Sequence, residues 1–122
     1  MEEQEKIREW CLRRQQTGFN GRPNKDVDTC YSFWVGATLE LLGCKDYINW
    51  TYVREFVMST EGSVTGGFGK SPDAHPDPMH SYLGLCGLSI GGEADLIPLF
   101  SALNISKRTK EWLTKIHEQR LM

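Results

Sequence analysis

Residues 29–42 read TCYSFWVGATLELL, and Gly43 follows them. Apolar side chains cover most of the circumference of a helix built from this segment, and a glycine commonly ends a helix. Asp28 or Thr29 could cap its start, because short polar side chains accept hydrogen bonds from the first free backbone N–H groups. A helix that is apolar on nearly every face is normally buried, so we expect residues 29–42 to form a central, buried helix.

The rest of the chain repeats this helical pattern. We expect further helices over residues 2–16, 46–59, 79–90 and 106–120, with a short piece over residues 96–103. Glycine-rich and proline-rich segments separate these helices, and no segment shows the alternation typical of a strand. The sequence therefore predicts an all-α class, in which helical hairpins lean on their neighbours as in a solenoid or ring.

The composition is that of an ordinary globular chain. Of 122 residues, 39% are hydrophobic and 25% are charged, and the formal net charge is -2. This balance provides no overall positive field to hold nucleic acid or an anionic membrane. No apolar run approaches the roughly 18 residues of a membrane span, and the acidic start does not resemble a signal peptide. We expect one segment over residues 1–122, with no second domain, no transmembrane segment, no nucleic-acid partner and a cytoplasmic location.

The four cysteines fall into two groups. Cys11, Cys44 and Cys86 lie in helical, partly apolar contexts, so we expect buried free thiols of the kind common in a reducing compartment. Cys30 differs, because a carboxylate and several cations lie close to it in the sequence.

Asp28, Cys30 and His80 are candidate metal ligands. They offer a hard oxygen, a soft sulfur and a borderline nitrogen, a mixed set that suits Zn²⁺ and leaves a fourth tetrahedral position open. The residues alone allow another interpretation, with Asp28 as a helix cap, Cys30 as a core thiol and His80 as a polar residue at a helix start. The spacing alone favours this second interpretation, because a lone Asp-x-Cys pair with a distant histidine is a weak signal for a metal site.

Several longer stretches resemble a known family. They are GRPNK at 21–25, VDTCYSFWVGATL at 27–39, GGFGKSPD at 66–73, HSYLGLCGLS at 80–89 and ALNIS at 102–106. In these stretches the chain resembles the β subunits of the protein prenyltransferases, most closely the type I geranylgeranyltransferase β subunit. The resemblance covers nearly the whole chain and corresponds to the C-terminal third of the family's α/α barrel, or toroid.

The resemblance implies a reaction and its partners. A geranylgeranyl group would pass from geranylgeranyl diphosphate to the cysteine of a C-terminal Cys-aliphatic-aliphatic-X (CaaX) motif, with leucine preferred at X. It also implies a heterodimer with a helical α subunit, and acceptors such as Rho/Rac-type small GTPases. Matched position by position, the zinc ligands and catalytic residues would be Asp28, Cys30 and His80.

The resemblance also assigns the substrate contacts. The diphosphate would be held by Arg22, Lys25 and Tyr31. Lys70 stands where the farnesyltransferase β subunit has an aspartate that recruits Mg²⁺, so the lysine would supply the positive charge and the reaction would need Zn²⁺ but not Mg²⁺. Met79 and Trp34 would line the lipid pocket, although a core tryptophan would give the same sequence pattern at position 34.

Two other functions stay open at this point. The β subunit of Rab geranylgeranyltransferase shares the ligands but acts on Rab proteins delivered by an escort protein. Alternatively, the chain could be a non-catalytic interaction module that retains zinc for structure. Because a third of a barrel leaves part of its wall uncovered, we also expect apolar side chains such as those of residues 33–35 to be exposed.

Overall fold

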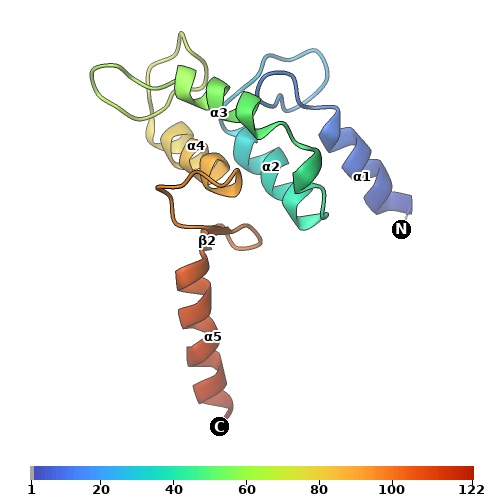
Figure 1. Ribbon diagram of the computed structural model, residues 1–122, viewed down its shortest axis with the longest axis vertical. Helices are drawn as coiled ribbons and strands as arrows, with labels where there is room; N and C mark the ends of the chain where they lie inside the picture. The colour runs from blue at the N-terminus through green and yellow to red at the C-terminus, as the bar shows by residue number, and fades with distance from the viewer. Residues whose placement is uncertain (1) are drawn as a thin grey trace.

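The computed structural model describes residues 2–122, which form mainly helices (Figure 1). In chain order the elements are α1 (Glu2–Leu12), α2 (Tyr31–Leu41), the 3₁₀ helix η1 (Lys45–Tyr47), α3 (Trp50–Ser59), α4 (Pro78–Ile90), β1 (Leu99–Phe100), β2 (Ile105–Ser106) and α5 (Lys107–Leu121). The predicted all-α class is confirmed, with one small addition. β1 and β2 pair in an antiparallel ladder where no strand was predicted, and Asn104, with φ of 50°, lies in the turn between them.

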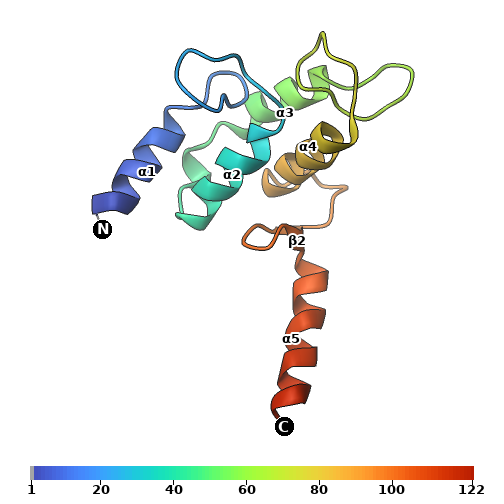
Figure 2. The same cartoon turned by 180° about the vertical axis from the view of Figure 1, so that it is seen from behind.

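Helices α2 and α4 lie side by side in both views (Figures 1 and 2). Gly87 of α4 permits the close approach, since an added Cβ there would overlap the side chain of Ser32 on α2. α1 packs on α2, and α3 packs on α4, as expected for helical hairpins. The larger of two buried apolar clusters draws on all four helices and the loops between them: Cys11, Phe19, Val35, Leu39, Cys44, Ile48, Val53, Val57, Phe68 and Leu88.

The central helix is buried on most of its surface, but not on all of it. Phe33 and Val35 are each 5% exposed, so the expectation that they would be exposed was wrong. Trp34 lies between them in the sequence but on another face of α2, and it is 54% exposed. This exposure excludes a core role for Trp34 in this structure. Leu41 extends the exposed side of α2 away from its start.

Two predicted helix boundaries were wrong, the end of α1 and the start of α3. α1 ends at Leu12, and Gln15 leaves the helix to form a bridge with Phe19. Residues 46–59 do not form one helix, because Ile48 is extended and buried, and Asn49 then caps α3 by accepting a hydrogen bond from the Tyr52 N–H. The carboxamide of Gln15 stabilises this interruption of the helix, because it donates a hydrogen bond to the Asn49 carbonyl and accepts one from the Asn49 N–H.

The remaining ends lie close to their predicted positions. α2 ends at Leu41, and Gly43 follows with φ of +70°, as expected for a glycine after a helix. At the start of α2 the cap position belongs to Cys30 rather than to Asp28 or Thr29, although Asp28 accepts a hydrogen bond from the Cys30 N–H at 3.0 Å. α4 starts at Pro78, one residue before the predicted Met79.

All four cysteines are buried free thiols, including Cys30. Burial raises the pKa of the Cys11 and Cys86 thiols above their usual value. α5 has no buried residue and projects away from the other helices, as both views show (Figures 1 and 2). Within residues 2–122, no helix combines the length and the apolar content needed to cross a membrane.

Candidate metal centre and cationic pocket

Asp28, Cys30 and His80 converge at the N-terminal ends of α2 and α4. One ligand atom from each residue can be chosen so that all three lie within 4.8 Å of one another. His80 Nε2 lies 3.1 Å from Asp28 Oδ1, although the two residues are 52 positions apart in the chain. Cys30 and His80 are buried and Asp28 is half-buried. A metal bound here would therefore have three ligands on the protein side.

The pKa of the Cys30 thiol helps to show whether a metal cation suits this cluster. Burial is the main cause that raises the pKa of the Cys30 thiol to about 12, and a hydrogen bond and the charge of Asp28 raise it further, while Lys70 opposes them. The negative charges of the Asp28 carboxylate and a Cys30 thiolate would repel each other. A divalent cation bound between them would stabilise both groups in their charged forms. The donor set and its electrostatics therefore fit zinc.

Asp77 fixes the orientation of His80. One oxygen of Asp77 accepts the His80 backbone N–H at 3.0 Å, and the other lies 2.6 Å from His80 Nδ1. The backbone N–H and then the ring of His80 lower the pKa of Asp77, so this carboxylate stays ionised. With Nδ1 hydrogen-bonded to Asp77, Nε2 faces Asp28 and is the nitrogen available to a metal. Sequence reasoning missed Asp77, yet an Asp-Pro pair three residues before His80 is a recognisable helix-cap pattern.

A cationic pocket opens beside the three ligands. It has a volume of about 390 Å³ and is lined by Gly21, Arg22, Lys25, Asp26, Asp28, Tyr31 and Lys70. All four residues expected to hold the diphosphate thus line one pocket, together with a metal-ligand candidate. Lys70 Nζ lies 4.0 Å from Asp28 Oδ2, which places this cation beside the cluster. Gly21 and Asp26 are lining residues that sequence reasoning did not select.

The loop that carries Arg22 and Lys25 is held in a fixed shape. Phe19 and Asn20 are buried, and the Asn20 side chain donates to the Lys25 carbonyl at 3.1 Å. Asn24 takes a φ of 61°, which lets the chain turn between the two cations. The Asp28 N–H donates to the Phe19 carbonyl at 3.0 Å. These contacts direct two cations from one short loop into the same pocket.

Gly21 leaves the space that Tyr31 occupies, and this leads to a testable expectation. A Cβ at position 21 would overlap the phenol ring of Tyr31. We expect Gly21→Ala to displace the phenol and to weaken binding of inorganic pyrophosphate about fivefold, the size of one lost hydrogen bond. Titration calorimetry measures this change. In a Tyr31→Ala background the same substitution should have little effect, and an equal loss in both backgrounds would refute the explanation.

The two lipid-pocket candidates lie outside the cationic pocket. Trp34 on α2 and Met79 on α4 are each 54% exposed, and neither lines that pocket. Tyr82 and Leu85 continue the exposed apolar side of α4, at 52% and 44% exposure. Because α2 and α4 are neighbours whose N-terminal ends meet at the cluster, exposed apolar side chains lead away from the site along both helices.

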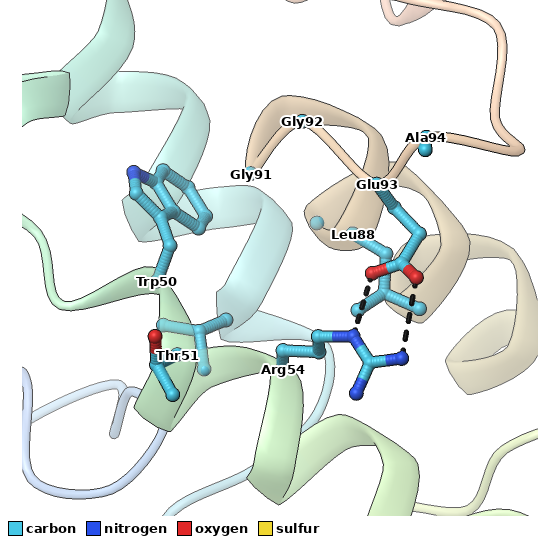
Figure 3. Close-up of a pocket in the computed structure, with 10 residues that line it drawn as sticks. Trp50, Thr51, Arg54, Leu88, Gly91, Gly92, Glu93 and Ala94 are labelled. Atoms are coloured by element: carbon cyan, nitrogen blue, oxygen red, sulfur yellow. Dashed lines mark hydrogen bonds and ion pairs between the residues drawn. The ribbon is translucent and has the colours of Figure 1, made fainter.

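A second pocket lies between α3 and the end of α4. Its volume is about 240 Å³, and it shares no lining residue with the cationic pocket. Figure 3 shows Arg54 of α3 reaching Glu93, which accepts hydrogen bonds from Nε at 2.8 Å and from Nη2 at 3.3 Å. An added Cβ at Gly91 would come within 2.8 Å of the Trp50 ring. These contacts tie the chain after α4 to α3, which is a structural role.

The chain matches one protein family over most of its length. The model of the prenyltransferase alpha-alpha toroid domain matches residues 1–117. The chain is 42% identical to the geranylgeranyl transferase type-1 subunit beta of Dictyostelium discoideum over 114 residues, and 46% identical to that of Arabidopsis thaliana over 98 residues. These alignments cover 92% and 79% of this chain.

A solved structure supports the same relationship. The protein geranylgeranyltransferase-I of Candida albicans, complexed with GGPP, superposes with a TM-score of 0.86 at 30% sequence identity. The superposition covers 93% of this chain and 37% of that one. Likewise, this chain spans 32% of the Dictyostelium protein and 26% of the Arabidopsis protein. By the matched domain, the sequence identities and the shared fold, this chain belongs to the prenyltransferase alpha-alpha toroid family.

Proposed function

We propose that this chain is the C-terminal part of a type I protein geranylgeranyltransferase β subunit. In that role it helps to transfer a geranylgeranyl group from geranylgeranyl diphosphate to the cysteine of a CaaX motif, with leucine preferred at X. The observation that carries the proposal is that the three metal-ligand candidates cluster directly beside the pocket lined by Arg22, Lys25, Tyr31 and Lys70, with Asp28 belonging to both. A thiol acceptor and a diphosphate donor need these two kinds of site side by side.

Asp28, Cys30 and His80 are the residues that would hold zinc, and Asp77 would orient the imidazole. A bound zinc ion would supply a Lewis acid that lowers the pKa of the acceptor cysteine, so that a thiolate is available at neutral pH.

The cationic side chains act on the leaving group. Arg22, Lys25 and Lys70 would hold the diphosphate, and the Tyr31 hydroxyl would donate a hydrogen bond to it. As the bond to the isoprenoid breaks, negative charge grows on the diphosphate, and these fixed donors would stabilise that charge. Lys70 supplies a positive charge beside Asp28, so the proposal includes activity without Mg²⁺.

The exposed apolar side chains of α2 and α4 would contact the isoprenoid chain of the substrate. Trp34 and Met79 would contact the isoprenoid near its diphosphate end, because both lie within the first turns of helices that start at the site. An aliphatic methionine leaves more room than an aromatic residue would. The proposal also includes an α-subunit partner, Rho/Rac-type acceptors and a cytoplasmic location.

A transfer assay tests this function. The purified chain would be combined with a type I α subunit, geranylgeranyl diphosphate and peptides that end in a CaaX motif with leucine. We expect transfer that stops when zinc is removed by a chelator, returns on zinc addition and does not need Mg²⁺. Transfer only to Rab proteins with an escort protein would favour the Rab enzyme instead. Binding of the α subunit without transfer, unchanged by Cys30→Ser, would favour the interaction module.

A further inference from the structure

We propose that Thr29 is a positioning residue that holds Lys70 at the cationic pocket. This inference rests on the proposed function, in which Lys70 contacts the diphosphate. Thr29 is fully buried and lies between Asp28 and Cys30 in the sequence, but it lines no part of the cationic pocket. Its N–H and hydroxyl bond instead to Gly69 and Lys70, which lie in the loop between α3 and α4.

The backbone N–H and the hydroxyl of Thr29 both donate hydrogen bonds to this loop. The Thr29 N–H donates to the Lys70 carbonyl at 3.1 Å, and the Thr29 hydroxyl donates to the Gly69 carbonyl at 2.7 Å. A second buried hydroxyl, that of Thr60, lies 3.3 Å away and donates to the Val57 carbonyl. The Gly69 carbonyl is the nearest of three acceptors around the Thr29 hydroxyl, since the Thr60 hydroxyl and the Lys70 carbonyl each lie 3.3 Å away, and Gly69 is itself buried.

The same loop is fixed to α4 from its other side. The Phe68 N–H donates to the Ser81 hydroxyl at 2.9 Å, and the Asp77 N–H donates to the Phe68 carbonyl at 3.2 Å. Thr29 thus completes a connection from the start of α2, through residues 68–70, to the start of α4. Those two helix starts carry Cys30 and His80.

The side chain of Lys70 has little else to hold it. It is 65% exposed, and its ammonium group lies 4.0 Å from the nearest carboxylate oxygen, that of Asp28. A long flexible side chain in this situation depends on its backbone for its position. Losing the Thr29 hydroxyl would leave the buried Gly69 carbonyl without its donor, and the backbone of Lys70 would shift to find another.

The test is a set of variants at two positions. Thr29→Val removes the hydroxyl while keeping the shape of the side chain, and Thr29→Ser keeps the hydroxyl. Each is made with Lys70 and with Lys70→Ala, and calorimetry measures binding of inorganic pyrophosphate to the zinc-loaded chain. With Lys70 present, Thr29→Val should weaken binding about fivefold to tenfold, since one neutral hydrogen bond is lost. Thr29→Ser should bind within twofold of the parent.

The effect of Thr29→Val in the Lys70→Ala background tests whether Thr29 acts through Lys70. If Thr29 acts through Lys70, Thr29→Val should change binding by less than twofold once Lys70 is alanine. Equal weakening in both backgrounds, or a serine variant as weak as the valine variant, would overturn the inference. If Thr29→Val does not fold, Thr29→Ala takes its place, with the same expected pattern.

The outcomes separate the two proposals. A parent chain that does not bind pyrophosphate, or binds it equally well with Lys70→Ala, contradicts the diphosphate pocket itself and so the proposed function. A parent that binds through Lys70, but tolerates Thr29→Val without loss, overturns the role of Thr29 alone.

Discussion

Replacing Cys30 by serine is expected to remove nearly all zinc from the purified chain. The parent should carry about one equivalent, as a three-ligand site predicts. Serine offers a hydroxyl that is a poor zinc ligand at neutral pH, and two ligands, Asp28 and His80, would remain. Elemental analysis should therefore find less than about a tenth of an equivalent, and transfer with the α subunit should fall at least about 100-fold. His80→Ala should behave in the same way.

The control for this experiment is a second buried thiol. Cys86 is also buried but lies outside the cluster, so Cys86→Ala should keep its zinc even if it lowers stability. Pyrophosphate binding by Cys30→Ser should persist in part, because the four diphosphate residues are unchanged. A Cys30→Ser chain that still binds one zinc would disprove the assignment of the ligands.

Substituting alanine for Gly87 should destabilise the fold, because the added methyl group lies where α4 packs against α2. The new Cβ would overlap the Ser32 side chain and come within 3.0 Å of the Ser32 carbonyl carbon, so the backbone of α2 would have to move. Alanine favours a helix over glycine by up to about 1 kcal/mol, but overpacking costs about 1–3 kcal/mol and more where backbone is involved. We expect a net loss of about 1–2 kcal/mol in the free energy of unfolding, measured with urea.

A compensating change at the contact tests this explanation. Ser32→Gly removes the side chain that the new methyl group would meet, so the double variant should regain part of the lost stability relative to Ser32→Gly alone. A Gly87→Ala chain as stable as the parent would show that α2 and α4 can separate without cost. Because these helices carry Cys30 and His80, zinc affinity should fall together with stability.

The sequence predicted the helices better than their ends. The apolar pattern of residues 29–42 was sufficient to identify the central helix, and Gly43 marked its end. It could not show that residues 46–59 are interrupted, since the interruption depends on Gln15, a side chain 34 positions away. It also missed the strands β1 and β2, which are only two residues each and too short to show alternation.

The candidate site was predictable through resemblance rather than through spacing. Nothing local indicates that His80 lies beside Asp28, because the contact depends on how α2 and α4 pack. The pattern Asp77-Pro78 before His80 could have identified the residue that orients the imidazole. Thr29 could not have been found, since its partners, the carbonyls of Gly69 and Lys70, are backbone groups of a distant loop.

The separation of 52 positions between Asp28 and His80 has a thermodynamic consequence. An ion bound by both residues would act as a cross-link that closes a long loop of the polypeptide. The unfolded chain would lose that cross-link, so free zinc would raise the melting temperature by mass action. The stability of the fold would then vary with the zinc concentration around it.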